Sequence, residues 1–147
     1  MTSGKNMKHT CKISLLIPFD RWLEGVPPKH KRPFLAAYTA ALLSEGVRAF
    51  RHGCVIIRKT PIGAGFNAYK THPHLLKYTK YPFIHAEAHA LFRAGLQNVS
   101  GATAYVIRLN KSGNVGHSKP CRMCQALFAE HGLSRIYYST NTGVVKL

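Results

Sequence analysis

The chain has 147 residues and a mass of 16.3 kDa, a length that accommodates one domain and excludes a multidomain assembly. Hydrophobic residues make up 46% of it, which is enough for a folded core and excludes a wholly disordered chain. Its 21 Lys and Arg against 5 Asp and Glu leave a formal charge of +16, which is unusual for an enzyme of small metabolites and indicates a polyanionic partner.

Residues 1–32 mix basic residues with glycine and proline, and we expect a basic N-terminal extension there, with a short strand or helical turn around 13–23. A single domain over 33–147 should follow. Within it, Pro33 opens residues 34–45, where apolar side chains recur at helical spacing up to a glycine, so this segment is predicted to be a helix.

The next segments predict a hairpin and then a long loop. Residues 54–59 are rich in β-branched side chains, and residues 64–68 can return as a second strand after a turn at 61–63. Residues 69–83 carry prolines, lysines and histidines without periodicity, which predicts a basic loop.

The second half alternates helices with strands. Apolar patterning and glycine stops predict, in order, a helix at 85–95, a strand at 103–109, a helix at 122–131 and strands at 136–139 and 144–146. Such alternation requires crossover connections, so we predict an α/β protein with three α/β/α layers around a central mixed sheet.

Residues suited to metal binding stand at the starts of two predicted helices. His85 begins one, and Cys121 and Cys124 form a Cys-x-x-Cys pair at the start of the next. Three protein ligands with one open position are typical of catalytic zinc, whereas a structural site takes four. Glu87 cannot share a helix face with His85 but can reach a bound water and move its proton. A redox pair or a structural zinc knuckle is the alternative for the two cysteines.

The segments His85-Ala86-Glu87 and Pro120-Cys121-Arg122-Met123-Cys124 resemble the H-x-E and P-C-x-x-C signature of the zinc-dependent cytidine/deoxycytidylate deaminase superfamily. The similarity extends over residues 47–139. It implies the cytidine deaminase-like fold and hydrolytic deamination of a nucleobase.

The resemblance also implies a role for each matching residue. His85, Cys121 and Cys124 would hold Zn²⁺, and Glu87 would carry protons to N3 of cytosine and to the leaving amine while hydroxide attacks C4. Asn67 corresponds to an asparagine that contacts the sugar or base. Beside the ligands, Ala86 and Pro120 are expected to line the substrate site, and backbone N–H groups at the helix starts by Ala86 and Cys121 could hold the water and the departing group.

Further substrate contacts are expected from residues around this site. In the basic loop, Tyr69 and His72 belong to an alternation of aromatic and cationic residues that suits stacking on bases and tracking of phosphates. His52 and His117 stand near a strand start and just before the Cys-x-x-Cys pair. Solvent-exposed roles are the alternative for each of these residues.

The charge guides the choice of substrate. A free nucleotide needs two or three basic residues, whereas a polynucleotide uses many. We therefore expect cytosine in single-stranded DNA or RNA, or in another phosphorylated substrate. Free dCMP or CMP, and adenosine in RNA, remain alternative substrates for an enzyme. A zinc-stabilised nucleic-acid-binding module that has lost turnover is an alternative from another class.

The setting of the protein is also predicted. No stretch is apolar over the roughly 20 residues that cross a bilayer, so we expect no membrane partner. The apolar run at 13–18 is short and lacks a small-residue cleavage site, which argues against a signal peptide. The cysteine pattern favours a reducing compartment, and hence the cytoplasm. The resemblance makes a homo-oligomer an expectation, because members of this superfamily commonly assemble.

Overall fold

The structure is a computed structural model that describes residues 17–46, 50–70, 72–73, 75 and 83–147. Cys11, the first half of the predicted N-terminal extension and much of the predicted basic loop lie outside the described residues. Among the residues described, no helix is long and apolar enough to cross a membrane.

One mixed sheet forms the middle of the molecule, and it runs β2-β1-β3-β5-β6 with the short β4 paired to β3. β3 and β5 are parallel, and every other pair is antiparallel. The strands are β1 (Arg51–Arg58), β2 (Thr60–Phe66), β3 (Thr103–Leu109), β4 (Val115–Gly116), β5 (Arg135–Thr140) and β6 (Gly143–Lys146). The predicted strands are therefore present, and the sheet also contains the short β4, which lies in the chain between β3 and the second predicted helix of this half.

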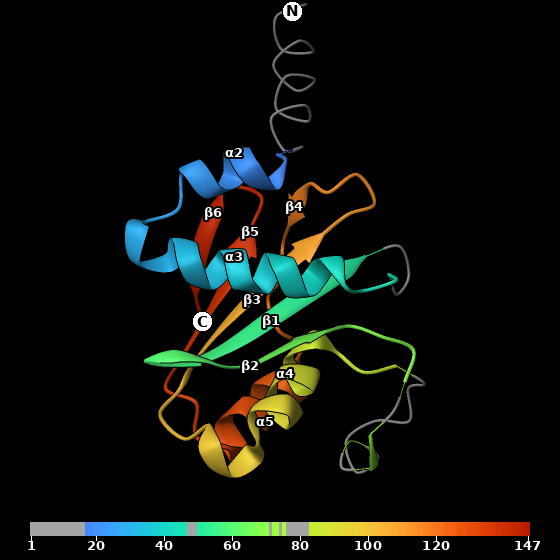
Figure 1. The fold of residues 1–147 in the computed structure, drawn as a ribbon, viewed down its shortest axis with the longest axis vertical. Coiled ribbons are helices and arrows are strands. Elements are labelled where there is room, and N and C mark those ends of the chain that lie inside the picture. The colour runs from blue at the N-terminus through green and yellow to red at the C-terminus, as the bar shows by residue number, and fades with distance from the viewer. Residues whose placement is uncertain (1–16, 47–49, 71, 74, 76–82) are drawn as a thin grey trace, which may run out of the picture.

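Helices cover both faces of this sheet, which confirms the predicted three layers (Figure 1). On one face lie α2 (Phe19–Glu24) and α3 (Pro28–Leu42), and on the other lie α4 (Ala86–Ala94) and α5 (Arg122–Glu130), with the short 3₁₀ helix η2 (Leu96–Asn98) after α4. Each face has its own hydrophobic cluster, so the sheet separates two cores.

The N-terminal part of the chain enters the fold earlier than expected. α3 begins at Pro28 rather than at residue 34, because the N–H that proline lacks would have no partner at the first position of a helix. Pro33 is accommodated inside the helix. α2 precedes it and buries Phe19 and Trp22 in the core under α3. Residues 17–32 thus pack as part of the folded unit.

The hairpin between β1 and β2 turns at a different place than predicted. The strands pair from Arg58 with Thr60, so the turn centres on Lys59, whose φ is 65°, and not on residues 61–63. Pro61 lies within β2, at the edge of the sheet, where a missing backbone donor is tolerated.

Glycines in β2 set the position of α4. A Cβ at Gly65 would collide with the α4 backbone at Ala86, His89 and Ala90, and one at Gly63 would lie 2.6 Å from Ala94. The helix therefore packs directly on the strand. His89 accepts a hydrogen bond at Nδ1 from the Phe66 N–H at 3.1 Å, which fixes α4 along the strand. This close packing determines where the first turn of α4 lies.

Candidate active site

Two helix starts meet at the candidate metal site. His85 is the N-cap of α4 and Cys121 is the N-cap of α5. His85 Nδ1 lies 3.6 Å from Cys121 Sγ and 3.4 Å from Cys124 Sγ. These three ligand atoms all lie within 4.8 Å of one another. The residues predicted to bind a metal are therefore brought together.

The donor set fits zinc. One imidazole nitrogen and two cysteine sulfurs are ligands that zinc prefers, and a set of three leaves a coordination position for water or substrate. Hydrogen bonds from Cys124 and His85 lower the pKa of Cys121 to about 4, so this sulfur is a thiolate at neutral pH. The pKa of Cys124 is raised by the hydrogen bond with Cys121 and by burial, and a bound cation would favour the thiolate form of Cys124.

Glu87 lies beside these ligands in a buried position, with a side chain only 6% exposed. Burial raises the pKa of its carboxyl, while the positive charge of His85 opposes the rise. A carboxyl in this environment exchanges a proton more readily near neutral pH than an exposed one does. Cys54 on β1 is buried near it, and burial raises the pKa of that thiol, as expected of an unreactive core cysteine.

A buried serine pair holds the segment that leads to Cys121. Ser118 Oγ donates to the Val106 carbonyl at 2.8 Å, and Ser139 Oγ donates to the Gly116 carbonyl at 2.8 Å. The two hydroxyls lie 2.8 Å apart. Because β3 and β5 supply these partners, the sheet itself positions the start of α5.

A cavity of about 430 Å³ opens beside the metal ligands. Among the predicted site residues, His52, Asn67, His85, Ala86, Glu87, His117 and Cys121 line it. Its other lining residues were not anticipated: Phe50, Phe83, Arg108, Ser118 and Lys119. Phe83 lies parallel to the His85 ring, with ring centroids 5.6 Å apart, and so forms an aromatic wall next to the metal site.

Asn67 is held firmly by its neighbours. Its Oδ1 accepts from Ser44 Oγ at 2.6 Å and from the His52 N–H at 2.8 Å, and its Nδ2 donates to the Phe50 carbonyl at 3.0 Å. These bonds join β1, β2 and the end of α3 around the cavity. Burial, Arg108 and His85 lower the pKa of His52 to about 4, so its ring is neutral at pH 7.

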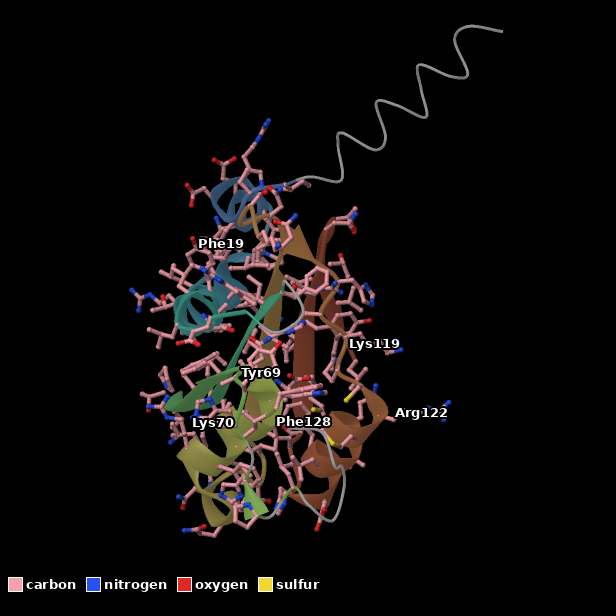
Figure 2. The ribbon with its side chains drawn as sticks, turned by 90° about the vertical axis from the view of Figure 1, so that its right-hand side faces the viewer. Phe19, Tyr69, Lys70, Lys119, Arg122 and Phe128 are labelled. Atoms are coloured by element: carbon pink, nitrogen blue, oxygen red, sulfur yellow. The ribbon has the colours of Figure 1, made fainter. Side chains whose placement is uncertain are left out.

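Arg108 contributes a fixed positive charge to the cavity wall. Its guanidinium lies over the Phe50 ring at 3.7 Å from the centroid and donates to the His117 carbonyl at 3.4 Å. Figure 2 shows Lys119 and Arg122 extending outward on the same side of the molecule, from the segment before α5 and from its first residue. A lone arginine in the otherwise apolar strand β3 is the sequence signal that could have indicated this wall.

Three predicted contacts lie away from the cavity lining. Tyr69 is 63% exposed, and its ring makes an edge contact with Phe83. His72 stacks on Phe92 with ring centroids 3.9 Å apart. Pro120 is buried, and its carbonyl accepts a hydrogen bond from Gln125 at 2.7 Å. The Pro120 carbonyl thus contributes to the support of α5, and substrate contacts by Tyr69, His72 and Pro120 stay predictions.

Comparisons with known proteins agree with this geometry. Residues 27–140 match the model of a family described as the cytidine and deoxycytidylate deaminase zinc-binding region. A search of the curated proteins found no match.

Solved structures share the fold. A cytidine deaminase from Burkholderia pseudomallei superposes with a TM-score of 0.57 at 18% identity, covering 80% of this chain and 91% of that one. A dCMP deaminase from the cyanophage S-TIM5 superposes with a TM-score of 0.55 at 16% identity, covering 78% of this chain and 86% of that one. A cytidine deaminase from Mycobacterium leprae superposes with a TM-score of 0.53 at 20% identity, covering 82% of this chain and 94% of that one. At these identities the likeness establishes a common architecture.

Proposed function

The chain belongs to the cytidine and deoxycytidylate deaminase zinc-binding family, and on that premise we propose that it is a zinc-dependent hydrolytic deaminase that converts cytosine to uracil in a phosphorylated substrate. One observation carries the proposal: His85, Cys121 and Cys124 converge at one end of a cavity that also contains the buried carboxyl of Glu87. A module that only binds nucleic acid has no need for a buried carboxyl at that position.

His85, Cys121 and Cys124 would hold the zinc ion. When bound, zinc supplies Lewis acidity and lowers the pKa of water toward 7. Glu87 then moves protons: its carboxylate takes one proton from the attacking water and gives it to N3 of the cytosine, then takes the second proton of that water and gives it to the amine that leaves C4 as ammonia. Water supplies the oxygen that replaces this amine. The raised pKa of Glu87 supports this role, because a carboxyl must hold a proton before it can donate one.

The cavity suits a base placed against the metal end. The ring of Phe83 provides an apolar surface on which the pyrimidine can lie, and Ala86 lines the cavity beside it. The hydrogen-bonded Asn67 and the neutral His52 supply polar atoms on the β1 side. A volume of about 430 Å³ falls in the range of cavities that hold ligands of nucleotide size.

Positive charge on the cavity wall supports a phosphorylated substrate. Arg108 and Lys119 line the cavity, and Glu87 is the sole carboxylate among the described residues of that lining. A neutral nucleoside would leave these charges unused. A phosphate group would pair with them, and a guanidinium offers it two parallel hydrogen bonds.

Mass spectrometry on a panel of substrates tests the proposal. The zinc-loaded protein is incubated with deoxycytidine, dCMP, CMP, short oligo-dC and oligo-rC, and an adenine-containing stem-loop. We expect conversion of cytosine in phosphorylated substrates with a higher kcat/KM than for deoxycytidine. Conversion of adenine alone, or of no base in the panel, would contradict the proposed function. Preference for deoxycytidine over every phosphorylated substrate would contradict the phosphate requirement.

A further inference from the structure

A second hollow adjoins the active-site cavity. Its volume is about 340 Å³, and three of its lining residues, Phe50, Arg108 and His117, also line the active-site cavity. Its other lining residues are Asn110, Asn114, Val115, Gly116 and Asn141. Three of these are asparagines, so we call it the asparagine hollow. The shared residues mean that one side-chain cluster separates two neighbouring spaces.

Arg108 carries a positive charge at the boundary between the two spaces. Phe50 and the His117 carbonyl hold its guanidinium, and both of these groups belong to residues that line both hollows. Among the described residues, no carboxylate forms an ion pair with Arg108. A half-buried guanidinium without an acidic partner is suited to an anion that spans the boundary.

The asparagine hollow is built on anchored backbone. Asn110 Oδ1 accepts hydrogen bonds from the N–H groups of Ser112 at 3.0 Å and Asn114 at 2.9 Å, which closes the turn between β3 and β4. The Val115 N–H donates to the Ile17 carbonyl at 2.8 Å, which ties this turn to the segment before α2. The turn therefore has a fixed shape before any ligand arrives.

Two asparagine side chains from different turns line the hollow. Asn114 lies between β3 and β4, and Asn141 lies between β5 and β6. In the part of the chain that the structure describes, neither side-chain amide forms a hydrogen bond. Each amide offers donors and an acceptor, which match the polar edge of a base or the hydroxyls of a sugar.

We propose that the asparagine hollow binds the nucleotide next to the target cytosine in a single-stranded nucleic acid, with the connecting phosphate on Arg108. This inference rests on the proposed function and names its substrate class. A mononucleotide fills one cavity and leaves the second without an occupant, whereas a dinucleotide fills both and places its phosphodiester at the boundary. The charge of +16 agrees, because a polyanion uses basic residues that a mononucleotide leaves unpaired.

Steady-state kinetics on dinucleotides tests the inference. The measured quantity is the ratio of kcat/KM for a cytosine-containing dinucleotide to that for dCMP, with cytosine at the 5′ or the 3′ position. We expect a ratio of about ten or more for one of the two positions, as two hydrogen bonds and a phosphate contact would provide. A ratio of one or below for both positions would overturn the proposal and assign the second hollow to another ligand.

Variants assign the effect to this hollow. In a double Asn114→Ala, Asn141→Ala variant the ratio should fall about tenfold, and in Asn141→Asp it should fall further, because a carboxylate there repels the phosphate. Gln97→Ala removes an amide that lines neither hollow and should preserve the ratio. Equal kcat/KM ratios in the parent and in all three variants would refute the proposal. Thermal melting confirms that each variant is folded.

A binding measurement separates this inference from the proposed function. Anisotropy of a labelled oligo-dC titrated with the Glu87→Gln protein reports affinity without turnover. Weaker binding when Asn114→Ala and Asn141→Ala are added supports the hollow even if no cytosine substrate is deaminated by the parent enzyme. Unchanged binding overturns the hollow even if dCMP is deaminated efficiently.

Discussion

Two regions of the cavity are built in different ways. The metal cluster, His85, Cys121 and Cys124 with Glu87, comes from the first turns of two helices and from short sequence spacings. The Arg108 partition, made of Phe50, Arg108 and His117, comes from three separate segments that only sheet pairing brings together. In the metal cluster Cys124 and Glu87 are buried and Cys121 is exposed, whereas none of the three partition residues is buried. Under the proposed function, the metal cluster determines the reaction and the Arg108 partition contributes to the choice of substrate.

The comparison is tested most strongly at Glu87. Replacement by Gln keeps the size of the side chain but removes its titratable proton, so we expect kcat to fall by about 10²–10⁴-fold. Zinc content and melting temperature should stay close to the parent values, because the three ligands remain. Glu24→Gln, in the exposed acid of α2, is the matched control. Retention of full activity in Glu87→Gln would remove the carboxyl from the mechanism.

The packing of α4 should show the next largest effect. In Gly65→Ala the added Cβ meets the backbone of α4, which cannot move aside as a side chain can, so we expect about 2–3 kcal/mol of destabilisation. Urea denaturation measures it. Gly25→Ala is the control, because its added Cβ would meet no atom closer than 3.7 Å. Equal stability of the two variants would show that close packing does not hold the metal cluster.

The serine pair should contribute less. Ser139→Ala removes hydrogen bonds to the Gly116 carbonyl and to Ser118, and we expect a loss of about 1–2 kcal/mol in the free energy of unfolding. Ser112→Ala, at an exposed turn, serves as the comparison. If chemical denaturation finds both variants as stable as the parent, the buried pair is not what anchors the segment before Cys121.

The smallest expected effect belongs to the partition. Arg108→Gln removes the charge but keeps a polar side chain, so the preference for dCMP over deoxycytidine, measured as a ratio of kcat/KM, should fall about fivefold. Arg58→Gln is the control, because Arg58 lines neither hollow and bonds the carbonyl of Asn98. A preference unaffected by Arg108→Gln would place phosphate recognition elsewhere.

Much of the fold follows from local patterns. The helix at 86–94 lies between its predicted cap and its glycine stop, and the strand at 103–109 has its predicted ends. The start of α3 was missed because consecutive prolines suggested a loop. Pro28 lacks a backbone N–H, but the first position of a helix has no use for one, so the helix can begin there. The hairpin turn was placed wrongly because Pro61 was interpreted as a turn residue, whereas the edge of the sheet accommodates it in β2.

The candidate site likewise contains residues that local sequence patterns identify and residues that they do not. Spacing and resemblance identified His85, Glu87 and the cysteine pair, because each helix start carries its own signal. Of the partition, His117 was predicted as a site residue, whereas Arg108 and Phe50 were not, since these two meet through the pairing of β1 with β3. That pairing joins segments far apart in the chain, and local patterns carry no information about it.

The zinc content of the purified protein tests the account most directly. Protein prepared without chelators is analysed for metals, alongside a Cys121→Ser, Cys124→Ser double variant and a Cys54→Ser control. We predict one zinc ion per chain in the parent and the control, and almost none in the double variant. Stoichiometric zinc in the double variant, or its absence from the parent, would contradict the assignment of these residues as the metal site.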